Sequence, residues 1–409
     1  MISDPPVKAV ITGIGVAAPN GFGAREYWSA TCAGRSGIGR ISRFDATPYP
    51  AQLAGEIAEF DAGKHLPGRL LPQTDRMTQL ALVTAEWALA DAGARTDELA
   101  EYEMGVITAS SSGGFEFGQR ELKALWSQGG RYVSAYQSFA WFYAVNSGQI
   151  SIRHGLRGPS GVLVSDQAGG LDAVAQARRH IRKGISLVLT GALDASLCPW
   201  GWVAQLTNDR ISTSDDPERA YLPFDPAAHG HVPGEGGALL VLESEESARS
   251  RGAAHIYGEI AGYAATFDPH PGTGREPGLR RAIELALRDA GEEPAAIDMV
   301  LADGAAVQDL DRVEAEAISE VFGPHGVPVT VPKSMTGRLC SGAAPVDLAA
   351  AFLAMRDGVI PPTAHSTASA DYAIDLVTSL RRARVRRALV VARGFGGFNS
   401  AMVVRSSDA

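Results

Sequence analysis

Apolar and polar residues alternate along this chain with two periods, one typical of buried strands and one typical of helices packed on a core. Residues 162–164 form a short apolar run, and residues 165–167 form a polar turn directly after it. The residues that follow recur at helical spacing on one face, namely Leu171, Val174, Arg178 and Ile181. The pattern therefore predicts a buried strand, a tight turn and a helix that begins beside Gln167.

The rest of the first half continues this alternation of strands and helices. Apolar runs predict strands at 8–18, 104–109 and 185–190, and another in the PGEGGALLVLE segment from Pro233. Amphipathic spacing predicts helices at 27–33, 78–93 and 115–126. The region 34–73 is polar and rich in Gly and Pro, which predicts mostly loop. The aromatic segment 138–155 predicts a packed helix near the 162–164 strand.

The second half repeats the plan of the first. Strands are predicted at 255–265, 299–302 and 327–331, helices at 278–291, 310–322 and 346–356, and two final apolar runs within 388–404. The order of strand, Gly-rich loop and helix in 327–356 matches the order in 162–183. We therefore predict an internal duplication with two helix-covered sheets, divided into residues 1–250 and 251–409.

Length and charge narrow the class of protein. The chain has 409 residues, of which 45% are hydrophobic, enough for a large core. Its formal net charge of -9 argues against binding to nucleic acid or to an anionic membrane surface. The N-terminal residues show no charged and apolar leader pattern, and no apolar run approaches the roughly 20 residues that span a bilayer. These features predict a cytoplasmic protein.

Cysteine usage gives no sign of a disulfide or metal framework. Cys32, Cys198 and Cys340 are widely spaced, and the sequence has no CxxC pair. We expect them to behave as small buried apolar residues, and we predict no metal site.

The turn at Gln167 is the most informative chemical feature. A strand, tight turn and helix place one side chain beside the free N–H groups of a helix start, which suits a nucleophile and an oxyanion site. Glutamine, however, cannot attack a thioester. The scaffold is thus typical of acyl transfer, while the attacking atom is missing.

Five separated motifs carry a resemblance over nearly the whole chain. The strings VITGIGVAAPNG, FDP, PGEGGALLVLE, PKSMTG and GFGGFNSA resemble the beta-ketoacyl synthases of the thiolase superfamily. The strings GGFEF, SFAWFYAVNSGQISIRHG, DQAGGLDA, PWGW and LADG resemble one branch, the chain length factors or ketosynthase beta subunits of bacterial type II polyketide synthases. The resemblance implies a thiolase-like α/β fold, with duplicated βαβαβαββ halves forming a five-layered αβαβα sandwich.

The resemblance also implies which functional positions are altered. Gln167 stands where a condensing ketosynthase has its nucleophilic cysteine, and Asp303 and Arg338 stand where it has two histidines. Lys333 is retained, which implies a structural or electrostatic role. The loop 394–397 is retained too, with the backbone of Gln167 and Phe395 as oxyanion-type donors. Two alanines, Ala305 and Ala306, replace hydroxyl residues that contact the pantetheine arm in the family, which weakens the case for carrier-protein binding by this chain alone.

The implied function is that of a non-condensing subunit. Its partner would be a ketosynthase alpha subunit with the full Cys and His set, and an acyl carrier protein would supply phosphopantetheine thioesters to the complex, with no cofactor bound by this chain. The helical face of Phe115, Gly118 and Leu122 would line the tunnel that sets polyketide chain length. Because Gly118 and Leu122 are small for such a gate, we expect a comparatively long tunnel, with Phe115 as the stop.

The sequence leaves several interpretations open. Without the resemblance, Gln167 is an ordinary helix-start residue, Asp303 a turn residue and the Phe115 face ordinary core. The basic clusters 178–183 and 381–387 are expected to be solvated helix ends without a docking role. Gln167 is also a candidate for assisting malonyl decarboxylation and priming. The chain is, in addition, compatible with a self-sufficient acyltransferase using Ser165 or Cys340, or with a purely structural partner, so an enzymatic activity of this chain by itself stays undecided.

Overall fold

The first half of the chain forms a five-stranded sheet. The computed structural model describes residues 7–270 and 272–408; residues 1–6, on which the expected absence of a leader partly rests, lie outside that range. The strands of this sheet are β1 (Ala9–Ala18), β5 (Met104–Ala109), β6 (Ser160–Leu163), β7 (Leu187–Asp194) and β8 (Gly236–Ser244). Their order is β6-β5-β7-β8-β1, with β5 parallel to β6 and β7, and β8 antiparallel to β7 and β1.

The second half builds the same sheet again. Its strands are β9 (Gly258–Phe267), β10 (Met299–Leu301), β11 (Pro328–Thr330), β15 (Arg387–Arg393) and β16 (Phe398–Ser406). Their order is β11-β10-β15-β16-β9, with the same sequence of parallel and antiparallel pairs. A short strand, β13 (Asp375–Leu376), extends the β11 edge. The predicted duplication is therefore confirmed at the level of topology.

The two sheets join at one edge, which the sequence did not indicate. Strands β1 and β9 pair at Val10 with Glu259 and at Ile11 with Gly258, so both halves belong to one hydrogen-bonded sheet of twelve strands. The short β2 (Gly21–Phe22) pairs with β1 off the continuous path. The prediction of two separate sheets was incomplete in this respect.

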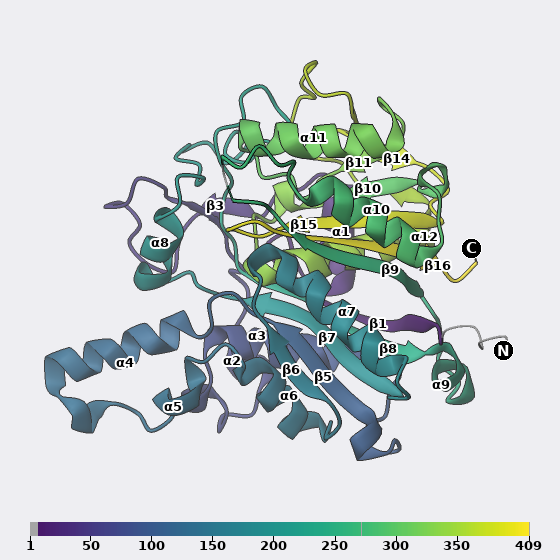
Figure 1. The fold of residues 1–409 in the computed structure, drawn as a ribbon. Helices are drawn as coiled ribbons and strands as arrows, with labels where there is room; N and C mark the ends of the chain where they lie inside the picture. Colours follow the sequence, from purple (N-terminus) through teal and green to yellow (C-terminus); the bar gives the residue numbers. More distant parts are fainter. Residues whose placement is uncertain (1–6, 271, 409) are drawn as a thin grey trace.

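Helices cover both sheets and fill the space between them (Figure 1). The middle layer consists of α7 (Gly169–Ile181) and α12 (Ala343–Asp357), which contact each other and both sheets. Residues 343–354 of α12 are all buried, and the many alanines among them let the helix pack closely on both sides. The outer layers are α3 (Arg76–Asp91) with α6 (Val145–His154), and α10 (Leu279–Ala290) with α11 (Gln308–Phe322). This arrangement is the predicted five-layered sandwich.

Several smaller elements surround this framework. Helix α4 (Phe115–Gln128) projects from the body of the molecule, at the lower left of Figure 1. The sequence did not predict α8 (Pro199–Leu206), which contacts α4. It also did not predict two small antiparallel two-stranded sheets, β3 (Ile38–Arg40) with β4 (Leu53–Gly55) and β12 (Val359–Ile360) with β14 (Arg381–Arg382). The remaining helices are α1 (Ala24–Cys32), α2 (Ala62–His65), α5 (Gln137–Ala140) and α9 (Glu245–Ser250).

The aromatic segment 138–155 departs from its prediction. It is two helices, α5 and α6, separated by a turn at 141–144. The carbonyl of Trp141 accepts from the N–H of Gly114 at 2.9 Å instead of continuing a helix. A tertiary contact therefore breaks the predicted helix, although α6 does pack against β6 as expected.

The basic cluster at the end of α7 also needs a correction. Arg178 is buried, pairs with Asp289 (Nη1 to Oδ2, 2.6 Å) and donates to the carbonyl of Ala261 at 2.6 Å. The expectation of a solvated helix end was wrong for Arg178, which ties the middle layer to the second sheet.

The three cysteines are free, with Cys198 and Cys340 buried and Cys32 half-buried. In residues 7–270 and 272–408 no helix has both the length and the apolar character needed to cross a membrane.

Candidate functional site

The turn between β6 and α7 places Gln167 inside the protein. Asp166 adopts a left-handed backbone conformation with φ 51°, and a single turn of 3-10 helix, Asp166–Ala168, leads into α7. The Gln167 side chain is 6% exposed, and its Oε1 has no hydrogen-bond partner among the described residues. This is an uncharged, buried amide at the point where the strand-turn-helix geometry presents a side chain.

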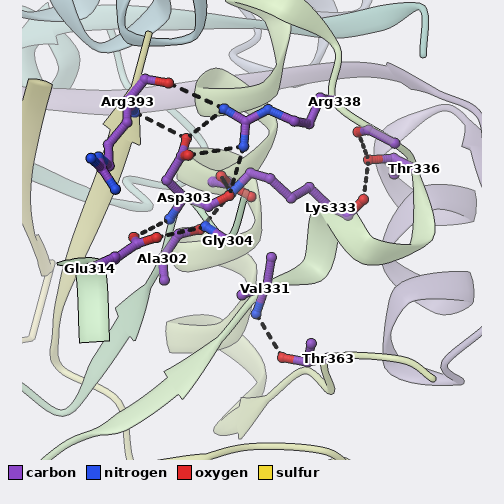
Figure 2. Close-up of polar contacts among 12 residues, drawn as sticks. Ala302, Asp303, Gly304, Glu314, Val331, Lys333, Thr336, Arg338, Thr363 and Arg393 are labelled. Atoms are coloured by element: carbon purple, nitrogen blue, oxygen red, sulfur yellow. Dashed lines mark hydrogen bonds and ion pairs between the residues drawn. The ribbon is translucent and has the colours of Figure 1, made fainter. Parts of the chain in front are cut away.

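Asp303 and Arg338 form a buried bidentate ion pair beside this turn (Figure 2). Asp303 follows β10, and Arg338 lies in the loop between β11 and α12. The Arg338 Nη1 lies 2.9 Å from Asp303 Oδ2, and Nη2 lies 3.1 Å from Oδ1. The two side chains at the predicted histidine positions thus satisfy each other.

The charges of this pair are mutually dependent. Burial alone would raise the pKa of Asp303, but the guanidinium of Arg338 and the ammonium of Lys333 outweigh that effect and hold the pKa below its usual value. Burial likewise opposes the charge on Arg338, yet Asp303 raises the pKa of Arg338 above its ordinary value. Both groups therefore stay ionised at neutral pH, and neither serves as a proton donor or acceptor there.

Backbone groups lock the pair in place (Figure 2). The N–H of Arg393 donates to Asp303 Oδ1 at 3.0 Å, and Arg338 Nη2 donates to the Arg393 carbonyl at 3.2 Å. The carboxylate of Glu314 accepts from the N–H groups of Asp303 and Gly304 at 2.6 and 2.9 Å. The loop after β10 is therefore held from two sides, which fixes Asp303 toward Arg338.

Lys333 lies behind this pair. It is buried, donates to the carbonyl of Ala302 at 2.6 Å and pairs with Asp347 at 2.6 Å. Burial raises the pKa of Asp347 to about 6, while Lys333 opposes that rise. These contacts link the β10 end to α12 and leave no Lys333 atom lining the cavity described below.

The loop 394–397 closes the site from the other side. The N–H of Phe395 donates to Asp166 Oδ2 at 2.8 Å. A carboxylate therefore accepts from the backbone donor that the sequence suggested for an oxyanion. This N–H can serve a thioester oxygen only if Asp166 moves away.

These groups converge on one cavity of about 470 Å³. Its lining includes Gln167, Asp303, Ala305, Arg338 and Phe395. The structure thus brings these five residues from the sequence analysis together, and it places Lys333 underneath the cavity and Ala306 outside its lining. No group of three or more His, Cys, Asp or Glu side chains in the described part of the chain is arranged for a metal ion.

Several cavity residues were missed by the sequence analysis, among them His231 and Arg210. His231 is buried with its Nδ1 unpartnered in the described structure, and burial together with the charge of Arg338 lowers its pKa well below the usual value. Arg210 stacks on the Phe395 ring, with the guanidinium carbon 5.1 Å from the ring centroid. His231 lies two residues before the PGEGG motif, and this position could have indicated a role in the site. No sequence pattern around Arg210 indicates that it lines the cavity.

The predicted tunnel residues lie apart from this cavity, on α4. Phe115 packs against Trp200 of α8, with ring centroids 4.7 Å apart. A Cβ at Gly118 would lie 3.0 Å from Trp200 Cζ3 and 3.7 Å from the Trp141 Cβ. Leu122, one helical turn further along, is exposed. The three residues share a helix face, and aromatic rings cover the part of it nearest the body.

Two family models match the chain in tandem. The beta-ketoacyl synthase N-terminal domain matches residues 8–248, and the beta-ketoacyl synthase C-terminal domain matches residues 257–367. The chain therefore belongs to the beta-ketoacyl synthase family. Within that family it belongs with the ketosynthase beta subunits, or chain length factors, of type II polyketide synthases.

Named relatives support this narrower class. The chain is 61% identical to the ketoacyl synthase beta subunit of the tetracenomycin polyketide synthase of Streptomyces glaucescens, over 98% of each chain. It is similar to the solved ishigamide ketosynthase/chain length factor, at 30% identity and a TM-score of 0.88 over 98% of this chain and 100% of the other. A third match is a type II ketosynthase solved with its acyl carrier protein and a bound hexaketide, AntDE:AntF, at 27% identity and a TM-score of 0.87 over 98% and 100% of the two chains.

Proposed function

We propose that this chain is the non-condensing subunit of a heterodimer and that a ketosynthase alpha subunit carries the nucleophile. The observation that carries the proposal is the buried Asp303–Arg338 pair beside Gln167. A condensing site needs a thiolate and neutral or protonated imidazoles that exchange protons. Here an amide and a locked ion pair occupy those places, so the thioester chemistry belongs to the partner.

The surface around β6 fits a partner of the same fold. Strand β6 is the last strand of the sheet and pairs only with β5 in the described chain. Exposed edges of this kind accept a strand from another chain. Large apolar side chains are exposed close to it: Val164 directly after β6, Ile152 on α6, which contacts β6, and Trp141, Phe142 and Tyr143 in the turn before α6. An apolar patch next to an open sheet edge is typical of a permanent interface, and the ishigamide ketosynthase/chain length factor joins the same two kinds of chain.

We propose that α4 limits the tunnel in which the partner extends its polyketide. Phe115 and Gly118 face Trp200, so side chains of α4 and α8 already fill the space between the two helices. The space beside Gly118 is therefore narrower than the small size of glycine suggests. A Gly118→Trp substitution is expected to shorten the product, because added volume must displace Trp200 or enter the tunnel.

Priming by Gln167 has weaker support. Loss of carbon dioxide from a malonyl thioester leaves an enolate, which needs cationic groups or free donors nearby. The Phe395 N–H is engaged by the Asp166 carboxylate, and Arg338 is engaged by Asp303. We therefore expect a Gln167→Ala heterodimer to form acetyl carrier protein at the normal rate, and a large loss of that rate would restore the priming role.

A self-sufficient acyltransferase is not favoured either. Burial raises the pKa of Cys340 well above its usual value, so its thiolate is scarce at neutral pH. The hydroxyl of Ser165 donates to the carboxylate of Asp172 rather than to a histidine. Neither side chain therefore has the activation that a nucleophile of this kind needs.

The experiment that tests the proposal is size-exclusion chromatography with intact-mass analysis. This chain is expressed alone and together with its ketosynthase alpha subunit, and each preparation receives malonyl-loaded carrier protein. We expect coelution near a 1:1 ratio, acyl adducts on the alpha subunit only, and polyketide from the pair only. An acyl adduct on this chain would show that it carries its own nucleophile.

We also propose that the phosphopantetheine thioester binds on the side of the alpha subunit and that this chain itself binds no cofactor.

A further inference from the structure

The N-terminus of α8 takes its hydrogen-bond acceptor from another helix. Pro199 is the first residue of α8, and the preceding Cys198 side chain makes no capping bond. The N–H of Trp200 is one of the donors that a helix start leaves without an internal acceptor. It donates instead to the side-chain Oε1 of Gln119 on α4, at 2.6 Å.

The same two helices also meet through the Trp200 ring. The ring packs on Phe115, and its Cζ3 lies 3.0 Å from where a Cβ at Gly118 would be. Gln119 follows Gly118 directly in α4. One short stretch of α4 therefore contacts Trp200 twice, through its backbone N–H and through its indole.

Helix α8 is anchored at Trp202, which is fully buried and donates its indole N–H to the Ala51 carbonyl at 3.1 Å, but the Trp200 side chain has fewer contacts. Helix α8 is only eight residues long, and the Trp200 side chain is 42% exposed. Because α8 lacks a capping side chain of its own, the Gln119 oxygen is the side-chain acceptor that holds the Trp200 backbone against α4. A half-exposed ring on a short helix would otherwise sample more than one position over Gly118.

We propose that Gln119 is a positioning residue for polyketide chain length, because it fixes Trp200 over the gap that Gly118 leaves in the α4 face. This inference rests on the proposed role of that face in limiting the tunnel. Gln119 itself need not touch the growing chain. Its effect passes through the Trp200 backbone, and it depends on an acceptor oxygen at this position.

The test uses the reconstituted heterodimer with its carrier protein and measures the ratio of longer to normal-length products. Gln119→Ala removes the acceptor and is expected to raise that ratio by about fivefold. This is the change in the populations of Trp200 positions that the loss of one hydrogen bond of ordinary net strength produces. Gln119→Glu keeps an oxygen at the same reach and is expected to retain the normal ratio. Lys123→Ala, an exposed substitution further along α4, is the matched control and should leave the ratio unchanged.

The outcomes separate this inference from the proposed function. If Gly118→Trp shortens the product while Gln119→Ala leaves the ratio unchanged, the tunnel role stands and the role of Gln119 is overturned. A fall in total product with an unchanged ratio would also overturn it, since that indicates a purely structural bond. If neither substitution alters product length, the proposed function of the α4 face fails first.

Discussion

At the residue scale, the most consequential feature is the buried ion pair of Asp303 and Arg338, at the two positions where the family resemblance predicts histidines. A lone aspartate or a lone arginine at these buried positions would be an uncompensated charge, which is costly inside a protein. Together they form a pair that keeps the shape of the pocket while removing its proton chemistry. The sequence analysis singled out each residue separately, but only the fold shows that their side chains face each other.

Removing one partner of this pair should therefore be far worse than removing both. We expect Arg338→Ala to lower the free energy of unfolding by about 3–5 kcal/mol, because Asp303 is left buried and unpaired. The double variant Asp303→Asn, Arg338→Met keeps an oxygen for the Arg393 N–H and should recover more than half of that loss. Chemical denaturation measures both values. Arg312→Ala, which breaks an exposed pair with Asp309, is the control and should cost less than about 1 kcal/mol.

Asp75 gives a second prediction, on pH dependence. It accepts from the N–H of Met77 at the start of α3 and from the N–H of Phe117 in α4, each at 2.8 Å. Burial raises its pKa to about 7, so between about pH 4 and 7 the folded chain holds a proton that the unfolded chain releases. The stability contributed by this group is present at low pH and is lost as the pH rises through about 7.

The Asp75→Asn variant removes this titration. The difference between the free energy of unfolding of the variant and that of the wild type should therefore increase by about 1 kcal/mol or more as the pH rises from about 4 to 7. Above about pH 7 the difference should stay constant. Denaturation curves at several pH values measure the difference. A constant gap between variant and wild type across that range would contradict the assigned burial effect.

At the element scale, the open edge of β6 is the feature that most needs a partner. Val164 follows the strand and is 52% exposed, so a charged residue there leaves the isolated chain folded. In a heterodimer that continues the sheet, the same charge would be buried without compensation.

We expect Val164→Lys to weaken association with the alpha subunit by about tenfold or more, which corresponds to about 1.4 kcal/mol. Analytical ultracentrifugation of the mixed subunits measures the affinity. Leu380→Lys, an equally apolar and exposed position in the second half, is the matched control. Equal affinities for both variants would place the interface elsewhere.

Elements differ in how well their sequence predicts them. Strand β5 has the predicted bounds, and α3, α10 and α11 lie within about two residues of theirs, since their periodic faces are long and end in Gly or polar residues. The 138–155 segment was wrong as one helix because the carbonyl of Trp141 bonds to Gly114, a contact from distant sequence. Helix α8 was missed because its N-terminal acceptor comes from Gln119 rather than from a local cap.

The candidate site shows the same division between local and distant causes. Gln167 could be predicted from the strand-turn-helix pattern, and Asp303, Arg338 and Lys333 from motifs that match a family. The Asp166 bond to Phe395 joins residues 229 positions apart, and no local pattern records it. No local sequence pattern shows that the Trp200 ring covers Gly118. The expectation of a comparatively long tunnel, which rested on the small size of Gly118 and Leu122, did not take this ring into account.

At the scale of the whole molecule, the duplicated halves share their core. The middle-layer helices α7 and α12 come from different halves, contact each other and belong to one hydrophobic cluster with strands of both sheets. The β1–β9 pairing and the Arg178–Asp289 ion pair cross the same boundary. The two five-stranded sheets thus repeat one topology, but each would expose its inner face if separated from its counterpart.

We therefore expect the chain to unfold as one cooperative unit. All six tryptophans lie in residues 1–250, so tryptophan fluorescence reports on the first half, whereas far-UV circular dichroism reports on both halves. The two denaturation curves should have the same midpoint, as two-state unfolding requires. A Phe352→Trp variant adds a fluorescence reporter to the buried face of α12, in the second half. Its fluorescence curve and its dichroism curve should again have the same midpoint. Two separate dichroism transitions, only one of them seen by the native tryptophans, would show that the halves are independent domains despite their shared middle layer.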